Sequence, residues 1–110
     1  ALEVVERSLA KSPKNPVFLQ MKADMLYKLG RFVEAAKIYE KSASDYLNRT
    51  GKSVRYWCAV GNLARIYKEM GDSEKSLQHA DLFKSPEYKQ IEKWMPASLV
   101  KDLKKKKLYP

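Results

Sequence analysis

The feature that most constrains this chain of 110 residues is a spacing of 34 residues between two similar helical patterns. The pattern A-x3-V-x2-S at residues 1–8 recurs as A-x3-Y-x2-S at residues 35–42, and 35 − 1 = 34. A small residue followed at helical spacing by a larger one lets two helices approach closely, and a fixed period makes successive helix pairs stack alike. The spacing therefore predicts an all-α chain of antiparallel helix pairs.

A longer copy of this pattern, over residues 16–49, contains both helices of a pair and the turn between them. It consists of Leu19, Ala23 and Leu26 in the first helix, Gly30 in the turn, and Ala35 and Tyr39 in the second helix. A further copy, over residues 53–84, reads V-x2-L-A-x2-Y at residues 60–67 and has Gly71 at its turn. Two consecutive pairs are thus indicated.

These residues resemble the tetratricopeptide repeat, in which one helix carries W-x2-L-G-x2-Y and a second helix, after a glycine turn, carries A-x3-F before a proline. The resemblance covers residues 1–84: the second helix of one repeat in 1–15, a full repeat in 16–49 and a divergent repeat in 53–84. It implies a right-handed solenoid of helix pairs. Residues 85–110 are expected to form capping helices and a basic tail.

The distance between the two glycine turns is longer than the family period. It is 71 − 30 = 41 residues, and turn-forming residues between Asp45 and Ser53 indicate that the insertion lies there. Gly30 and Gly71 are expected to end helices in the left-handed conformation. The expected helices span residues 1–11, 16–29, 32–47, 53–70, 73–84, 87–94 and 96–106.

Both ends of the predicted array carry apolar helix faces, which would be exposed to water unless another segment packs on them. Pro86 and Pro96 suit the first turns of two capping helices. Those helices carry an apolar stripe made of Tyr88, Ile91, Trp94, Met95, Leu99, Val100 and Leu103. At the other end, Leu2, Val5 and Leu9 have no predicted partner within the chain. We expect that N-terminal face to be covered by upstream sequence or by another chain.

Charge and composition narrow the classes of partner. The net charge is +9, with 15 basic and 10 acidic side chains in residues 1–84 and 7 basic and 3 acidic side chains in residues 85–110. A basic surface favours nucleic acid, an anionic membrane or an acidic protein segment. There is no apolar run long enough to span a membrane, no leader pattern and a single cysteine, so we predict an intracellular protein, cytoplasmic or nuclear.

The sequence offers little that could support catalysis. His79 and Cys58 are the only residues of their types and fall on different predicted helices, while the four glycines are dispersed and form no phosphate-binding loop. Histidine and cysteine do not cluster at the spacing of a zinc site. We therefore predict that the protein is not an enzyme and binds neither a cofactor nor a metal.

The resemblance directs attention to a concave groove, which the first helices of successive tetratricopeptide repeats line. Residues that point away from the predicted core on these helices are Gln20, Met21, Asp24, Lys28, Asn62, Arg65, Lys68 and Glu69. Amide and charged groups can hydrogen-bond the backbone of an extended peptide, and Met21 can accommodate an apolar side chain. The expected function is a protein interaction scaffold or adaptor that binds a peptide or a partner subunit.

The C-terminal lysines admit three interpretations. These residues are Lys101, Lys104, Lys105, Lys106 and Lys107. They could be solvated charges at a helix terminus, a contact for an acidic partner or nucleic acid, or a nuclear-import signal. The alternative function is a basic RNA- or ribosome-associated helical module that uses this tail together with Lys14, Arg49, Lys52 and Arg55.

Overall fold

The described residues, 2–11 and 16–109 of the computed structural model, form helices joined by short turns, and none of them forms a strand. The helices are α1 (Leu2–Lys11), α2 (Pro16–Lys28), α3 (Phe32–Thr50), α4 (Val54–Glu69), α5 (Ser73–Asp81), α6 (Pro86–Ile91) and α7 (Ala97–Lys105), with 3-10 turns η1 (Leu82–Lys84) and η2 (Glu92–Trp94). The prediction of an all-α chain is confirmed.

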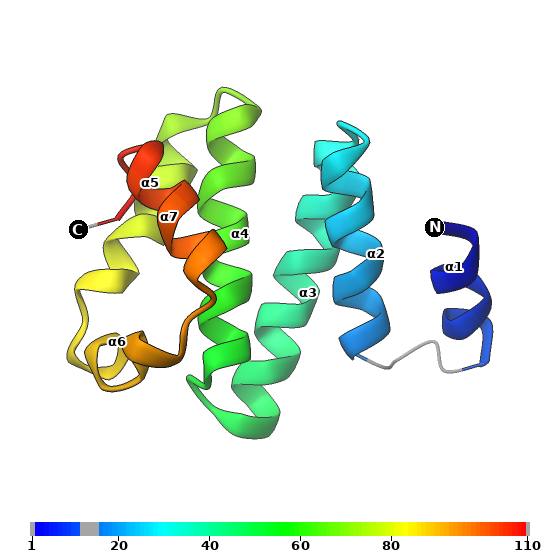
Figure 1. Cartoon of the computed structure of the whole chain (residues 1–110), viewed down its shortest axis with the longest axis horizontal. Coiled ribbons are helices and arrows are strands. Elements are labelled where there is room, and N and C mark those ends of the chain that lie inside the picture. The colour runs from blue at the N-terminus through cyan, green and yellow to red at the C-terminus, as the bar shows by residue number, and fades with distance from the viewer. Residues whose placement is uncertain (1, 12–15, 110) are drawn as a thin grey trace.

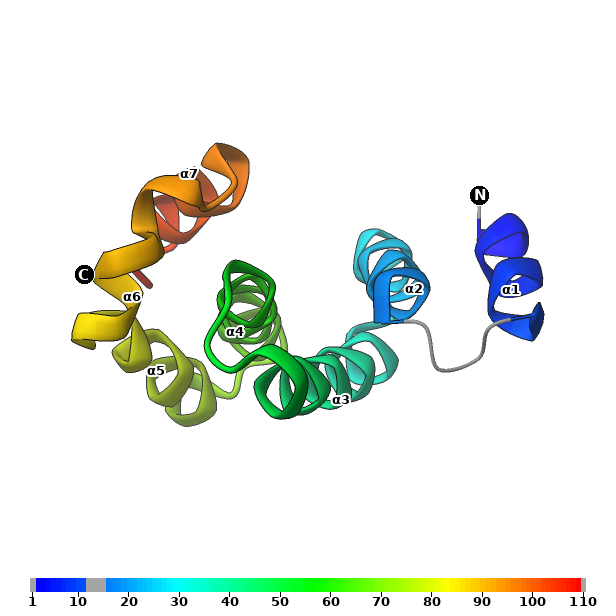
Figure 2. The same cartoon turned by 90° about the horizontal axis from the view of Figure 1, so that it is seen from below.

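Consecutive helices from α2 to α5 pack side by side in alternating directions (Figure 1). Figure 2 shows that they form two layers, with α2 and α4 on one side and α3 and α5 on the other. Helix α7 returns to the side of α2 and α4 and lies against α4. The last helix therefore covers part of the face on which a groove was predicted.

Glycine ends the two helices that precede the short turns, as predicted. Gly30 has φ +79° and Gly71 has φ +80°, a left-handed conformation that costs a glycine little. The amides of Arg31 and Asp72 then reach back to the carbonyl groups of Leu26 and Tyr67, both at 2.9 Å. These bonds satisfy carbonyls that a helix end would otherwise leave free.

The insertion before α4 differs from the prediction. Residues 48–50, which were expected to lie beyond the end of the helix over 32–47, continue α3 to Thr50, and only Gly51, Lys52 and Ser53 connect α3 to α4. The stretch contains no proline or glycine before Gly51, and the Thr50 hydroxyl donates to the Tyr46 carbonyl within the helix. The extra residues therefore lengthen a helix rather than a loop.

Helix α4 lies at the centre of the core. Its Leu63, Ile66 and Tyr67 pack with α2 and α3, while its Trp57 and Val60 face the C-terminal part of the chain. The small residues Ala23, Ala35 and Ala64, which the repeat pattern singled out, are all buried. A single helix with two apolar faces thus joins the two halves of the molecule.

The C-terminal helices bury most of the predicted apolar stripe, with two differences from the prediction. Of the predicted stripe, Tyr88, Met95, Leu99 and Leu103 are buried and Ile91 and Val100 are half-buried, whereas Trp94 is 61% exposed. Trp94 ends the 3-10 turn η2, none of whose three residues is buried. Pro96 precedes α7 rather than opening it.

The last described residues, Leu108 and Tyr109, fold back onto the preceding helices. Leu108 is buried in the C-terminal core, and the Tyr109 hydroxyl lies 2.7 Å from the Tyr88 hydroxyl and donates to Glu92 at 2.6 Å. At the opposite end, the predicted open face of α1 consists of Leu2, Val5 and Leu9. The side chains of these three residues lie outside the described part of the structure.

Candidate functional site

The open part of the predicted groove lies on α2. Gln20, Met21 and Asp24 of α2 and Arg55 of α4 line a cavity of about 170 Å³. Helical spacing places the three α2 residues on one face. Helix α3 lies in the layer next to α2 (Figure 2). Three of the eight groove residues predicted from the sequence are therefore brought together, and they are joined by Arg55, which had been assigned to a rival basic surface.

The cavity is lined by polar, charged and apolar side chains. The Gln20 Oε1 atom is buried and has no hydrogen-bond partner among the described residues, whereas the Met21 side chain is 42% exposed. A buried acceptor without a donor costs free energy. The cavity is thus lined by the Gln20 side chain, an apolar contact and the cationic Arg55.

Asp24 is held in place by the layer behind it. The Tyr39 hydroxyl donates to an Asp24 carboxylate oxygen, so α3 orients this carboxyl group toward the cavity on α2. Burial raises the pKa of Asp24, although the Tyr39 hydrogen bond and nearby Arg65 act in the opposite direction. Burial also raises the pKa of Tyr39, so its hydroxyl stays protonated and remains a donor.

On α4 the predicted groove is closed by α7. A Cβ atom at Gly61 would lie 3.2 Å from side-chain carbons of Leu99 and Leu103. The absence of a side chain at Gly61 therefore lets α7 approach the α4 backbone. Asn62 is only 5% exposed, so it does not present the open groove surface that was expected of it.

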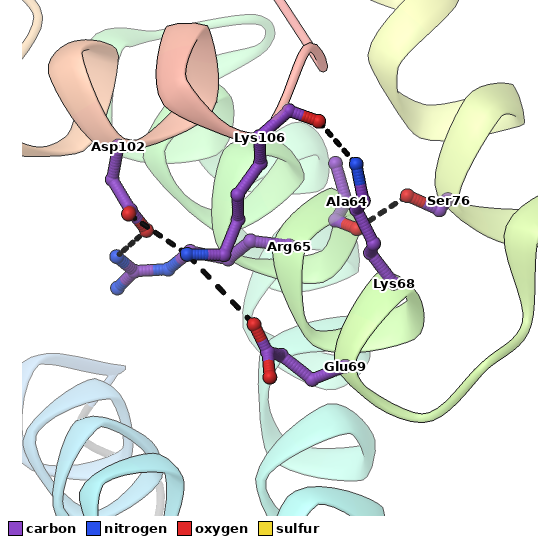
Figure 3. A network of polar contacts seen from close by, with 7 residues as sticks. All are labelled: Ala64, Arg65, Lys68, Glu69, Ser76, Asp102 and Lys106. Carbon is purple, nitrogen blue, oxygen red and sulfur yellow. Dashed lines mark hydrogen bonds and ion pairs between the residues drawn. The ribbon is translucent and has the colours of Figure 1, made fainter.

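The other predicted α4 residues hold α7 rather than facing solvent freely (Figure 3). Arg65 donates to Asp102 at 3.1 Å, and Lys106 lies 3.8 Å from Glu69. Lys68 donates to the Lys106 carbonyl. Three side chains that were expected to bind a partner are thus engaged within the chain.

The ion pairs alter the charge states at this junction. Burial alone would raise the pKa of Asp102, but hydrogen bonds from Lys106 and Arg65 hold that pKa below its usual value. The Asp102 hydrogen bond raises the pKa of Lys106. Both groups are therefore charged at neutral pH, and Lys106, which was predicted as a possible contact for an acidic partner, pairs with Asp102 within the chain.

The remaining tail lysines are exposed, and their surroundings differ. Lys101 and Lys105 lie on the outer surface of α7, while the Lys104 amine lies 5.4 Å from the centre of the Tyr109 ring. Lys107 has φ +61°, a left-handed conformation. The five tail lysines therefore do not form one uniform charged segment.

The rival basic surface is dispersed among the described residues. Arg49 and Lys52 are exposed near the turn between α3 and α4, and Lys52 lies 3.9 Å from Glu87. Lys14 lies outside the described residues. Lys28, the remaining predicted groove residue, is exposed at the C-terminal end of α2 and does not line the cavity.

The two residues considered for nucleophilic chemistry are both engaged structurally. Cys58 is buried in the core, and burial raises its pKa to about 11, which disfavours the reactive thiolate. The His79 ring packs against Tyr67, with Nδ1 2.8 Å from the Lys75 carbonyl. Within residues 2–11 and 16–109, no three acidic, histidine or cysteine side chains gather as a metal site would require.

Comparisons with protein-family models, curated proteins and solved structures found no match to this chain. Its function must therefore be argued from its own residues. None of the described helices combines the length and apolar character needed to cross a membrane.

Sequence reasoning missed the position of α7, although one signal was present. Gly61 lies in the middle of a helix, where glycine costs about 1 kcal/mol relative to alanine. Because Gly61 ends no helix, a glycine at this position is typical of a site where another segment approaches the backbone closely. The pairing of Arg65 with Asp102, 37 residues later, left no comparable local pattern.

Proposed function

We propose that this chain is part of a tetratricopeptide-like, right-handed helical array that binds a protein or peptide partner and catalyses no reaction. It would act as a scaffold or adaptor within the cell, in the cytoplasm or the nucleus. The cavity lined by Gln20, Met21, Asp24 and Arg55 is the observation that carries this proposal. We name it the α2 groove.

The α2 groove has complementary groups for an extended peptide. The Gln20 side-chain amide can hydrogen-bond a backbone group, and a carbonyl or carboxylate oxygen can accept from Arg55. An apolar side chain of the peptide can pack on the exposed Met21. Because these groups project from helices, the backbone that carries them does not have to be ordered when they bind.

Helix α7 limits the site to this half of the array. It covers Gly61 and engages Arg65, so a partner would contact α2 and the beginning of α4 rather than the whole face of α4. A short peptide segment fits this restricted surface better than a long one.

The test begins with selection of 12-residue peptides from a random displayed library on the immobilised protein. Fluorescence anisotropy then measures the affinity of labelled selected peptides for Gln20→Ala, Arg55→Glu and the control Lys37→Glu, which changes an exposed residue of α3. We expect each groove variant to weaken binding about tenfold and the control to change it less than about twofold. Equal binding to all variants, or no selected peptide, would contradict the proposal.

A further inference from the structure

A second concave surface lies at the C-terminal end of the molecule, between α5 and the segment that follows α7. Two cavities of about 210 and 190 Å³ share Leu77, Lys107 and Leu108 as lining residues. The first extends toward Lys68 and Ser73, and the second toward Lys84. We call this surface the C-terminal cleft; it is separate from the α2 groove and none of its lining residues is shared with it.

The centre of the cleft is apolar. Leu108 is 4% exposed and packs on the core, while Leu77 is 53% exposed and lines both cavities. Each cavity is smaller than the roughly 300–1,000 Å³ of typical small-molecule sites. The dimensions therefore suit an inserted side chain better than a complete small ligand.

Lysines surround this apolar centre. Lys68, Lys84 and Lys107 line the cleft, against the single acidic residue Asp81. Asp81 lies 3.4 Å from Lys84. Lys68 donates to the Lys106 carbonyl and has no carboxylate partner among the described residues. The rim therefore carries uncompensated positive charge.

Lys107 occupies a position at which glycine is the usual residue. Its φ is +61°, and the following amide, that of Leu108, donates to the Leu103 carbonyl at 2.8 Å, a bond typical of helix ends that carry glycine. The left-handed conformation is unfavourable for a residue with a side chain. The Lys107 amine makes no hydrogen bond or ion pair within the described chain, so stability does not explain the lysine.

We propose that the C-terminal cleft docks an acidic segment of a partner protein. An apolar side chain of that segment inserts between Leu77 and Leu108, and its carboxylates pair with Lys68 and Lys107. The net charge of +9 favours approach of such a segment. Nucleic acid fits less well, because the only aromatic ring lining the cleft, Tyr109, already packs against Phe83 and lies beneath the Lys104 amine.

The experiment uses four fluorescein-labelled probes and anisotropy at about 0.15 M salt. The first is a 15-residue peptide with one leucine among glutamates and serines; the second replaces leucine with alanine, and the third replaces the glutamates with glutamines. The fourth is a 20-nucleotide oligouridine. The protein variants are Leu77→Asp and Lys107→Gly, with Lys101→Ala as a control that removes one exposed charge outside the cleft.

We expect the leucine-containing acidic peptide to bind most tightly. Leu77→Asp should weaken its binding by about tenfold, and Lys107→Gly by about two- to fivefold. Lys101→Ala should change it less than about twofold. Because glycine suits the left-handed position, Lys107→Gly should fold at least as stably, so its weaker binding would not reflect unfolding.

Several results would overturn the proposal: absence of binding to the first peptide at about 1 mM, equal binding of the second or third peptide, binding of oligouridine alone, or unchanged affinity in both cleft variants. Circular dichroism of each variant verifies that it folds. Arg55→Glu, which alters only the α2 groove, should leave binding of the acidic peptide unchanged. Failure at one surface is therefore distinguishable from failure at the other.

Discussion

The Arg65 guanidinium group donates to the Asp102 carboxylate at 3.1 Å and thereby joins α4 to the last helix. The same guanidinium carbon lies 4.7 Å from the centre of the Tyr27 ring on α2. One side chain therefore contacts three helices, and a cation over an aromatic face adds to the attraction of the ion pair. Arg65 is better described as a structural residue than as a ligand-binding one.

Removing the carboxyl partner should weaken the attachment of α7. We expect Asp102→Ala to lower the free energy of unfolding by about 1 kcal/mol, because it removes hydrogen bonds from both Arg65 and Lys106 on partly exposed side chains. Urea denaturation monitored by circular dichroism measures the change. Asp81→Ala, which breaks the far more exposed pair with Lys84, is the control and should change stability by less than about 0.5 kcal/mol.

The two acidic residues Asp24 and Asp102 should respond to pH in opposite directions. The pKa of Asp102 is lowered on folding, so its stabilising contribution is present above pH 3.8, its ordinary pKa, and is lost as pH falls through the folded-state value. The pKa of Asp24 is raised, so its ionised form opposes folding at neutral pH. Protonation of Asp24 therefore favours the folded state.

The Asp24→Asn variant tests whether the ionised Asp24 carboxylate opposes folding at neutral pH. The asparagine Oδ1 can still accept from the Tyr39 hydroxyl, but it carries no charge to bury. We expect the variant to have the higher urea midpoint at pH 7 and to converge on the unmodified protein as pH falls below about 4. A lower midpoint at pH 7 would show that nearby cations, not burial, decide the energetics of Asp24.

A large residue at position 61 should disrupt the contact between α4 and α7. We expect Gly61→Leu to destabilise the fold by about 1–3 kcal/mol, because Leu99 and Leu103 leave no room for it. In a Leu103→Ala background the same substitution should cost less, since the added side chain can fill the space left by Leu103. Equal costs in both backgrounds would mean that α7 does not pack on Gly61.

The alanines singled out by the repeat pattern provide a test of the core. Ala35 and Ala64 are both 0% exposed, so Ala35→Asp or Ala64→Asp should lower stability by about 3 kcal/mol or more through burial of an unpaired charge. Ala97→Asp, at an exposed site in the first turn of α7, is the control and should have little effect. Thermal melts followed by circular dichroism compare the three variants.

Local sequence patterns predicted the helix ends and the small packing sites of this fold. They did not predict the contacts between segments that are distant in the sequence. Gly30 and Gly71 marked helix ends because the left-handed conformation is a property of single residues, and Ala35 and Ala64 marked packing sites because their spacing is helical. The contact of α7 with Gly61 depends on how residues some 40 positions apart meet in space. Helical periodicity within one segment gives no information about which distant segment packs against it.

Of the groove residues predicted on two helices, only those on α2 line the observed cavity, for the same reason. Gln20, Met21 and Asp24 share a helix face, so spacing alone grouped them. Arg55 lies at the cavity because α4 packs on α3. Asn62 does not line the cavity and is buried. Charged residues such as Arg65 and Lys106 were expected to face solvent because their tertiary partners could not be identified from the sequence.

The last prediction separates a protein-binding scaffold from a nucleic-acid binder through the exposed tail lysines. Replacing Lys101, Lys104 and Lys105 with serine should leave peptide binding at the α2 groove within about twofold, because none of them lines that cavity. If RNA were the partner, each lost phosphate contact would reduce the slope of log affinity against log salt by about 0.7, so the triple variant would lose about 2 units. Anisotropy with a selected peptide and with a 20-nucleotide oligouridine, each at several salt concentrations, measures both quantities. Arg55→Glu provides the reciprocal change, since it alters the groove and leaves the tail intact. Tight oligouridine binding that disappears in the triple variant, together with peptide binding that Arg55→Glu does not affect, would favour the RNA-associated module over the scaffold.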